Sequence, residues 1–153
     1  MKCFLLLLVA LGICVSCTSS YKKASAFNSE GFIDFRLGRD AFKITYNGGA
    51  FTNLETAVDF CLLRCAEISL DRGYSYFRVT RDSAGISRYI IKNPDLVGTL
   101  DGYPVRISGG YSEDIPRAVA TNTIVCRNDV PHKTSDFLNA RKIQQFIKKK
   151  YSN

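Results

Sequence analysis

Cysteine is the residue type with the widest chemical range in this sequence, which holds six Cys and a single His. Cys61 and Cys65 are four residues apart, so a helix would place them on one face, where they could form a metal or redox pair. The alternative is two small core residues, since cysteine is among the most buried residue types. A structural zinc site needs four ligands, and the chain has no C-x-x-C and only His132 besides. The sequence therefore predicts no metal site and no cofactor.

Nucleophilic catalysis finds little support in the residue pattern. The chain lacks the G-x-S-x-G nucleophile elbow, and His132 follows Pro131 in a loop segment. A cysteine would pair with His132 only if the fold happened to bring the two together. Because no set of residues fills the roles of nucleophile, base and oxyanion donor, we expect no catalytic residue and a protein that is not an enzyme.

The helix expected from residue 52 onward carries the side chains best suited to contact a partner. Arg64 and Glu67 are three residues apart and can pair. Such a pair is either surface decoration worth well under ~1 kcal/mol, or the Arg64 guanidinium fork fixes a loop or a partner. Phe60 and Leu63 lie away from the main apolar stripe, so they either form an exposed docking patch or lie under a second layer such as residues 31–41.

The N-terminus has the layout of a secretory signal peptide. Lys2 precedes ten uncharged residues, Phe4 to Ile13, as in the charged n-region and apolar h-region of such signals. This run is too short to span a bilayer, which takes roughly 20 apolar residues. We therefore assign residues 1–16 to a signal peptide.

Val15-Ser16-Cys17 resembles the bacterial lipobox, in which a small residue directly precedes a Cys. The resemblance implies a diacylglycerol thioether on Cys17 and an acylated amine, with chains such as palmitate that together anchor the protein stably. Thr18 at the next position resembles an outer-membrane address. The alternative is ordinary cleavage after Ser16, which would leave Cys17 as a free thiol.

These signals predict three segments and an oxidising compartment. Residues 17–30 would be the lipidated Cys17 with a flexible tether, and residues 31–153 a single periplasmic domain, which is long enough for a real core. With Cys17 acylated, at most one disulfide can form, from Cys126 to Cys61 or Cys65, and one thiol is left over. Sequence alone does not show whether the geometry permits this bridge.

The charge balance narrows the expected partners. The formal net charge is +7, which suits phosphate-bearing lipid, lipopolysaccharide or anionic cell-wall polymer. We expect no nucleic-acid partner, because a secreted, lipidated chain rarely meets one. The run Lys148 to Lys150 is shorter than the roughly 4–8 basic residues typical of strong lipid recognition.

The hydrophobic pattern predicts two helices among several strands. Thr52-Asn-Leu-Glu55 reads as a capping box that begins the first helix, and Gly73 as its C-terminal stop. Thr134 or Ser135 would cap the second, whose apolar stripe holds Ala140, Ile143, Ile147 and Tyr151. The expected strands are residues 42–46, 74–80, 88–92, 103–108 and 118–126. This order predicts a two-layer α+β domain with a strand-helix-strand start, a mostly antiparallel sheet and two helices packed on one face.

The stretch from Gly31 to Val79 resembles a family of small proteobacterial outer-membrane lipoproteins of unknown function. That family has a Gly-Tyr-Ser-Glu turn, where this chain has Gly31-Phe-Ile-Asp34, and a Gly-Asn pair, where it has Gly48-Gly49. Its helix core is Leu-x-Arg-Ala-Ala-Glu-Leu, followed by Gly-Tyr-x-x-Phe. The residues that match directly are Arg64, Glu67, Gly73, Tyr74 and Phe77, whereas Cys65 replaces an alanine. The resemblance implies fold and location, and it implies no activity.

Together these features predict a lipid-anchored outer-membrane protein with its domain facing the periplasm. We expect a non-enzymatic structural or accessory subunit of an envelope assembly, such as a secretion or transport machine, with an envelope protein as its partner. One alternative is a periplasmic binding module for an anionic lipid, lipopolysaccharide or peptidoglycan. Another is a thiol-based envelope sensor that uses Cys126 with Cys61 or Cys65.

Overall fold

A computed structural model describes residues 21–25, 29–92, 96–100, 103–107, 112–129 and 136–152. The predicted signal peptide, Cys17, His132 and the helix caps proposed at Thr134 and Ser135 lie outside these residues. The strands are β1 (Gly31–Arg36), β2 (Ala41–Asn47), β3 (Tyr76–Lys92), β4 (Leu96–Leu100), β5 (Tyr103–Ile107), β6 (Ser112–Arg127) and β7 (Leu138–Asn139). The helices are α2 (Leu54–Asp71) and α3 (Ala140–Lys150).

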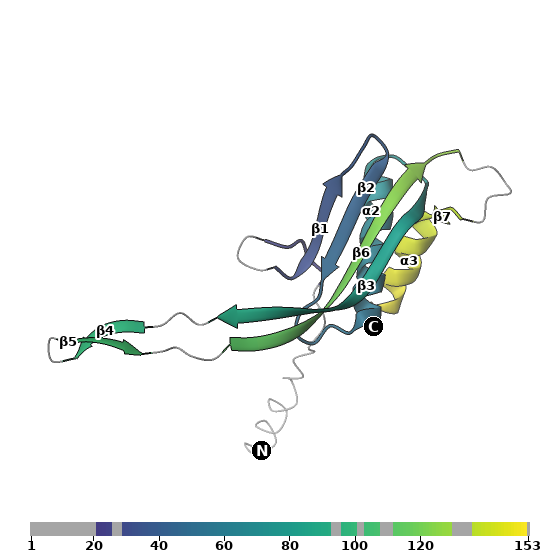
Figure 1. The fold of residues 1–153 in the computed structure, drawn as a ribbon. Helices are drawn as coiled ribbons and strands as arrows, with labels where there is room; N and C mark the ends of the chain where they lie inside the picture. Colours follow the sequence, from purple (N-terminus) through teal and green to yellow (C-terminus); the bar gives the residue numbers. More distant parts are fainter. Residues whose placement is uncertain are drawn as a thin grey trace, which may run out of the picture.

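The main sheet has the strand order β1-β2-β6-β3-β7, and all its neighbouring strands are antiparallel. Both helices lie on the same side of this sheet (Figure 1). The predicted two-layer α+β fold is confirmed, including the strand-helix-strand unit, which is β2-α2-β3. Strands β2 and β3 run in the same direction, but β6 lies between them and pairs with both.

Alternation along the strands decides which side chains form the core. In β2, Phe42, Ile44 and Tyr46 are buried, whereas Lys43 between them is exposed. Successive side chains in a strand point to opposite faces, so one face of the sheet packs against α2 and the other does not. The buried residues that α2 contributes include Ala57, Cys61, Cys65, Ala66 and Ile68.

Helix α2 begins one residue later than the capping box predicts. The N-cap is Asn53, whose side-chain Oδ1 accepts a hydrogen bond from the Thr56 backbone N–H at 2.7 Å. The Thr52 hydroxyl instead accepts from the Gly49 N–H at 2.9 Å, which closes the preceding turn. The predicted cap at Thr52 is therefore wrong, because Asn is an equally good N-cap and Thr52 is already engaged.

The predicted stop of α2 at Gly73 is confirmed. Gly73 has a φ of +81°, a conformation that glycine adopts without strain. Its N–H bonds to the Leu70 carbonyl at 2.9 Å, and the Tyr74 N–H bonds to the Ser69 carbonyl at 2.8 Å. This pair of bonds is the Schellman motif that satisfies carbonyls at a helix end.

Strand β3 joins two segments that the sequence pattern separates. The strands predicted at 74–80 and 88–92 are parts of one strand, which is irregular between Val79 and Arg81. It pairs with β6 along its length, and the two form a ribbon that extends beyond the helices (Figure 1). Strands β4 and β5 form a separate two-stranded sheet.

Helix α3 begins at Ala140, after the N-cap Asn139, whose side chain accepts from the Lys142 N–H at 3.0 Å. The predicted caps at Thr134 and Ser135 are wrong, because Leu138 and Asn139 are extended and pair with β3 as β7. The predicted stripe is confirmed at Ala140 and Ile147, which are buried. The lysines of its last turn interact favourably with the negative C-terminal end of the helix dipole.

Candidate functional site

The described segment 21–25 lies against β1, within the region for which the sequence predicted a flexible tether. The Phe32 N–H donates to the Lys22 carbonyl at 2.9 Å, and the Ala24 N–H donates to the Phe32 carbonyl at 3.1 Å. The Tyr21 ring packs against the Phe32 ring with 5.3 Å between centroids. The packed domain therefore begins by Tyr21 and not at residue 31.

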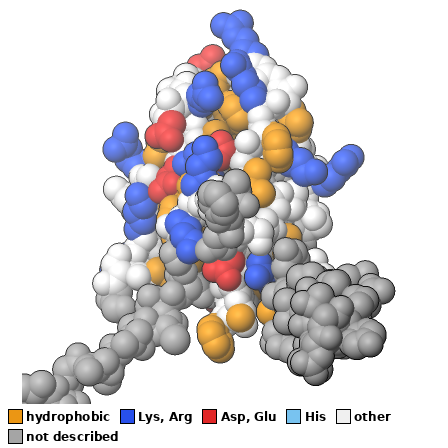
Figure 2. Space-filling model, turned by 90° about the vertical axis from the view of Figure 1, so that its left-hand side faces the viewer, with side chains coloured by type: hydrophobic (Ala, Val, Ile, Leu, Met, Phe, Trp, Pro, Cys, Tyr) orange, Lys and Arg blue, Asp and Glu red, His pale blue; other side chains and the backbone are white. Residues whose placement is uncertain are grey.

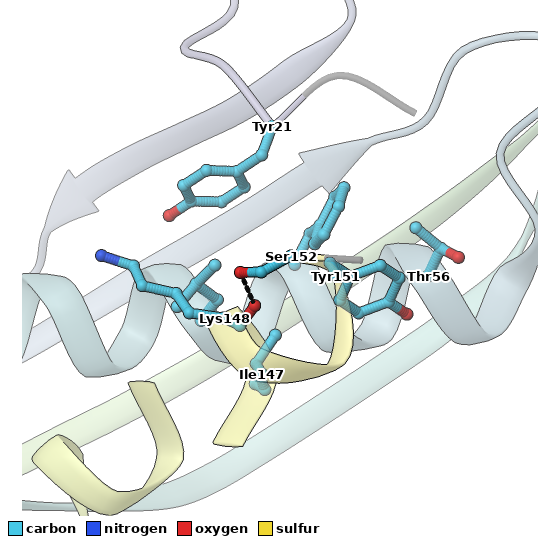
Figure 3. Close-up of a pocket in the computed structure, with 8 residues that line it drawn as sticks. Tyr21, Thr56, Ile147, Lys148, Tyr151 and Ser152 are labelled. Carbon is cyan, nitrogen blue, oxygen red and sulfur yellow. Dashed lines mark hydrogen bonds between the residues drawn. The ribbon is translucent and has the colours of Figure 1, made fainter. Parts of the chain in front are cut away.

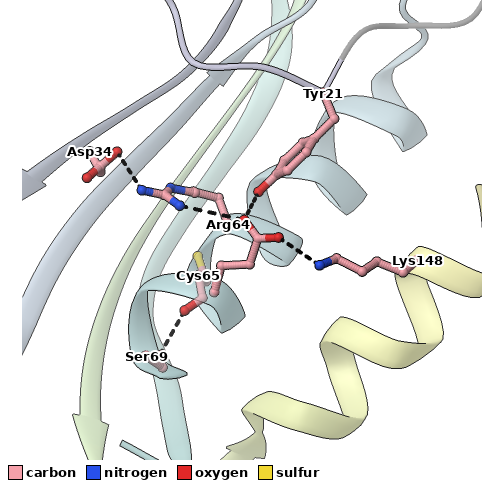
Figure 4. Close-up of polar contacts among 7 residues, drawn as sticks. Tyr21, Asp34, Arg64, Cys65, Ser69 and Lys148 are labelled. Atoms are coloured by element: carbon pink, nitrogen blue, oxygen red, sulfur yellow. Dashed lines mark hydrogen bonds and ion pairs between the residues drawn. The ribbon is translucent and has the colours of Figure 1, made fainter. Parts of the chain in front are cut away.

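A polar cluster formed by Tyr21, Asp34, Arg64, Glu67 and Lys148 joins four segments of the chain. The Tyr21 hydroxyl donates to Glu67 Oε2, and Lys148 Nζ lies 3.3 Å from Glu67 Oε1. Arg64 lies between two carboxylates, 3.6 Å from Glu67 Oε2 and 3.4 Å from Asp34 Oδ1. Tyr21, Arg64 and Lys148 converge from the N-terminal segment, α2 and α3 (Figure 4).

Arg64 fixes β1 to α2 through more than its ion pairs. Its guanidinium lies over the Phe32 ring at 4.3 Å from the centroid, which adds a cation–π contact. Its Nε is buried and has no hydrogen-bond partner among the described residues. The predicted pair with Glu67 is confirmed, and Arg64 contacts a neighbouring strand through Asp34 as well.

The side chains of this polar cluster have a structural role. Burial raises the pKa of the Tyr21 hydroxyl, and its hydrogen bond to the Glu67 carboxylate raises it further. Tyr21 therefore stays protonated at neutral pH and acts as a hydrogen-bond donor. The five side chains of the cluster form hydrogen bonds and ion pairs with one another. These contacts hold the N-terminal segment, β1 and α3 against α2.

Phe60 and Leu63 do not form an exposed docking patch. Each is only 4% exposed. The Phe60 ring lies 5.3 Å from the rings of Tyr21 and Tyr46 and 4.9 Å from that of Tyr151. Of the two alternatives, the exposed docking patch is therefore wrong, and burial of both side chains is confirmed. The aromatic rings that pack against Phe60 belong to Tyr21, Tyr46 and Tyr151, and none of these lies in residues 31–41.

A cavity of about 510 Å³ lies where the N-terminal segment meets the two helices (Figure 3). Its walls are mainly aromatic and aliphatic, with hydroxyls and one ammonium group, that of Lys148. This ammonium is already paired with Glu67. The lining residues are Tyr21, Thr56, Phe60, Leu63, Ile147, Lys148, Tyr151 and Ser152.

Ion pairs also hold the end of α3 against the start of α2. Lys150 Nζ lies 2.7 Å from Asp59 Oδ2 and 2.5 Å from Glu55 Oε1. The Tyr151 hydroxyl donates to the same Asp59 oxygen at 2.7 Å. Two lysines of the predicted basic run, Lys148 and Lys150, are thus engaged within the domain.

The three cysteines are buried and free. The Cys61 thiol donates to the Ile44 carbonyl at 3.6 Å, and Cys126 Sγ lies 3.3 Å from the Ser69 hydroxyl. Burial raises the pKa of Cys65 and of Cys126. The interpretation as core residues is confirmed, and the disulfide considered from Cys126 is absent. Among the described residues, no three His, Cys, Asp or Glu side chains are grouped to hold a metal.

The face of the sheet opposite the helices, here called the open face, carries hydroxyl and basic side chains. The pairing register places Lys43, Thr123 and Arg81 in one row across β2, β6 and β3. In the next row, Thr45 and Thr121 share a hydrogen bond of 3.0 Å. A hollow of about 460 Å³ lies on this face, lined by Leu37, Lys43, Thr80, Arg81, Ser83, Thr121 and Thr123.

Where β2, β6 and β3 pair with one another, the charged residues of the open face are all basic. The rows that join β2, β6 and β3, from Val119 to Val125 on β6, include Lys43, Arg78 and Arg81. No Asp or Glu occupies an open-face position in these rows, since Asp82 pairs with Asn122 on the helix side. Figure 2 shows the neighbouring side of the molecule, where acidic side chains lie between the basic ones.

Sequence reasoning missed Tyr21, Asp34 and Lys148 as members of the polar cluster. Tyr21 reads as part of a polar tether, and its contact with Glu67 joins residues 46 positions apart. The only local signal was that Tyr21 is one of two aromatic residues, with Phe27, in an otherwise mostly small and polar segment. For the open face, the sequence showed only the alternation of apolar and polar residues along single strands. Which strands lie side by side depends on the order of strands in the sheet.

We expect Gly31→Ala to release the N-terminal segment. Gly31 has a φ of +116°, and a Cβ there would lie 2.1 Å from the Lys22 carbonyl oxygen. Because side chains rarely adopt this φ, the substitution costs about 1–3 kcal/mol of stability. Trypsin should then cleave after Lys22 and Lys23 about five- to a hundredfold faster, since each ~1.4 kcal/mol lost raises the population of the opened segment tenfold.

The matched control for this prediction is Gly85→Ala, because a Cβ at Gly85 meets no atom within 4 Å. We expect that variant to keep the slow cleavage and the urea midpoint of the natural chain. Equal cleavage rates after Lys22 in the Gly31→Ala variant and the natural chain would show that the segment is not held in place by β1.

Comparisons with known proteins identify no relative of this chain. The chain matches no protein-family model, no curated protein and no solved structure. Among the described residues, no helix is long and apolar enough to cross a membrane. The resemblance to small outer-membrane lipoproteins therefore stays a prediction from the sequence.

Proposed function

We propose that this chain is a lipid-anchored, non-enzymatic subunit of an envelope assembly that binds an acidic partner protein through its open face. The signal-like N-terminus and the lipobox-like Val15-Ser16-Cys17 support an anchor on Cys17. The domain would then stand on the periplasmic side of the outer membrane.

The observation that carries this proposal is the basic charge of the open face where β2, β6 and β3 pair, a region on the opposite side of the sheet from both described helices. Lys43, Arg78 and Arg81 share that face with the half-buried apolar side chains of Val119 and Val125. Protein interfaces commonly combine an apolar centre with polar surroundings, and complementary charge speeds association and selects partners. An acidic surface of a partner fits both properties.

Two further observations support action by contact and not by catalysis. The side chains of the polar cluster are engaged with one another in joining segments of the domain. The thiols of Cys61, Cys65 and Cys126 are buried, where burial raises the pKa of Cys65 and Cys126 and so lowers thiolate reactivity. For the same reason, the geometry does not favour a thiol-based sensor.

A second candidate is a binding module for an anionic envelope ligand, which the hollow on the open face favours. Its lining combines the cations of Lys43 and Arg81 with the hydroxyls of Thr121 and Thr123. Phosphate and carboxylate groups accept hydrogen bonds from both kinds of donor. The ligand would be a lipid, lipopolysaccharide or peptidoglycan.

One experiment tests both candidates. The lipidated protein is purified from gently solubilised membranes, and its partners are quantified for the natural chain and for Lys43→Glu/Arg81→Glu. The control is Arg141→Glu/Lys142→Glu, an equal charge change on exposed positions of α3. We expect a stoichiometric protein partner that the first variant loses and the control keeps. Partner binding unchanged in both variants would overturn the role of the open face.

The other outcomes separate the two candidates and the anchor. If no protein copurifies, but vesicles or cell-wall fragments bind in a salt-sensitive way that requires Lys43 and Arg81, the ligand-binding candidate replaces the first. Cys17→Ala should leave the protein outside the membrane fraction. A variant that stays fully membrane-bound would refute the lipid anchor.

A further inference from the structure

The ribbon formed by β3 and β6 extends past β2 and β7, the described strands that pair with its two edges. Register pairs residues 81–92 of β3 with residues 112–123 of β6. Strand β2 pairs with β6 only over residues 119–125, and β7 pairs with β3 only at Tyr76 and Phe77. Among the described residues, no strand pairs with the outer edge of β3 from Arg78 to Lys92. Figure 1 shows this ribbon leaving the part of the sheet that the helices cover.

A ribbon of two strands is a weak structure in water. Two strands alone are marginally stable, and an exposed edge offers unpaired N–H and C=O groups as a template for another strand. The edges differ, since β6 carries Pro116, which lacks an N–H, whereas residues 81–92 of β3 contain no proline. Ile86 on β3 is an apolar side chain that is 59% exposed. The β3 edge is therefore the one suited to strand addition.

We propose that this edge pairs with β3 of a second copy of the chain, antiparallel and centred on Gly85. The pattern of charged residues along β3 is the reason for proposing a second copy of this strand as the partner. In this register, Asp82 of each copy lies opposite Arg88 of the other, so the strand is complementary to itself. Opposite charges directly across a strand pair are stabilising, and a two-fold axis produces the pair twice.

The neighbouring positions fit the same register. Gly85 lies at the axis, and a Cβ there would meet no atom within 4 Å, so the site is open to an approaching backbone. Ile86 lies opposite Ala84 of the second copy, which covers its exposed side chain. Arg88 already contacts Asp114 of β6 at 2.7 Å and is 78% exposed, so its guanidinium can serve a second carboxylate. A register shifted by one residue would place Asp82 opposite Tyr89 and lose both ion pairs.

The pairing has a structural consequence. An antiparallel pair with its two-fold axis normal to the sheet continues the sheet from one copy into the other and keeps the same face on the same side. The two open faces would then form one surface of doubled length. This dimer does not depend on what the open face binds.

Cysteine cross-linking of the lipidated, full-length protein in detergent tests the register. Gly85→Cys should form a covalent dimer under mild oxidation, because position 85 faces itself. Ser87→Cys should not, because it faces position 83. A mixture of Ser83→Cys and Ser87→Cys chains should again cross-link. The natural cysteines Cys61, Cys65 and Cys126 are buried and serve as an unreactive background.

A charge exchange tests the occupant by a second route. Sedimentation should show a dimer for the natural chain at micromolar concentration. Asp82→Arg should weaken this dimer about tenfold, because both ion pairs are lost. Asp82→Arg/Arg88→Asp should restore it, and Lys43→Glu, away from the edge, should leave it unchanged. A monomer throughout, equal cross-linking at positions 85 and 87, or no restoration by the exchange would overturn the proposal.

Discussion

Phe60→Ala is expected to lower the free energy of unfolding by about 3–5 kcal/mol, the usual cost of removing a buried aromatic ring. The Phe60 ring contacts Tyr21, Tyr46 and Tyr151, so it joins the N-terminal segment, β2 and the end of α3. Phe60 lines the cavity of about 510 Å³, so loss of its ring would enlarge that cavity. Urea unfolding followed by circular dichroism measures this change.

The matched control is Phe51→Ala, because Phe51 is 85% exposed. Surface substitutions usually change stability by no more than ~0.5 kcal/mol. If Phe60→Ala were as mild as Phe51→Ala, Phe60 would be a surface residue and the docking interpretation would return. The comparison thus separates a structural role of Phe60 from a direct role in partner binding.

The second large effect is a loss of stability at alkaline pH. Burial raises the pKa of Tyr46 to about 12, with the nearby Glu30 carboxylate as a smaller cause. Burial likewise raises the pKa of Tyr21 and of Tyr151. An unfolded tyrosine titrates near 10, so above that pH the unfolded chain has lost protons that the folded chain keeps. The stability that these tyrosines contribute is therefore fully present below pH 10 and is lost as pH rises.

The size of this effect follows from the linkage relation. A buried tyrosine whose pKa is raised contributes a slope of about 1.4 kcal/mol per pH unit, so Tyr46 alone accounts for roughly 3 kcal/mol by pH 12. Tyr151 is 37% exposed, so solvent screening makes its contribution smaller. The raised pKa values of Cys65 and Cys126 act in the same direction from about pH 8.5 upward. Urea midpoints at pH 8, 9, 10 and 11 measure the slope.

Tyr46→Phe provides the control for the alkaline effect. The variant lacks the titrating hydroxyl, so its stability should fall less steeply above pH 10, whatever its stability at pH 8. Slopes that coincide for the variant and the natural chain would contradict the buried, protonated state of Tyr46.

If the dimer forms, it changes how the open face would work. Two copies present their faces on one side, so a repetitive or symmetric partner could engage both at once. The second contact would then be intramolecular, and avidity would exceed the affinity of a single face. A dimer-breaking Asp82→Arg change should therefore weaken binding to such a partner without altering Lys43 or Arg81.

Much of the fold could be predicted from local sequence. The alternation around Phe42 to Tyr46 indicates a half-buried strand because side chains in a strand have a period of two. Gly73 marks the end of α2 because few other residues adopt its positive φ. The spacing of Ala140 and Ile147 indicates an amphipathic helix. These features depend on contacts between residues near one another in sequence.

Other features depended on the tertiary structure. Tyr21 belongs to the domain because its hydroxyl donates a hydrogen bond to Glu67 and its ring packs against Phe60. Phe60 is buried because three aromatic rings from distant parts of the chain pack against it. Strand β3 is continuous because β6 pairs along it, although its local pattern resembles two short strands.

The sequence by itself determined the class of fold, the direction of the charge balance and the absence of a familiar catalytic pattern, since these depend on composition and on short periods. The tertiary structure decided which side chains meet. The order β1-β2-β6-β3-β7 gathered Lys43, Arg78 and Arg81 on one open face and left the edge of β3 unpaired. Strand pairing is determined by contacts between residues far apart in sequence. The free energy of these contacts, which combines the cost of loop closure with the gain from packing, cannot be read from a short stretch of sequence.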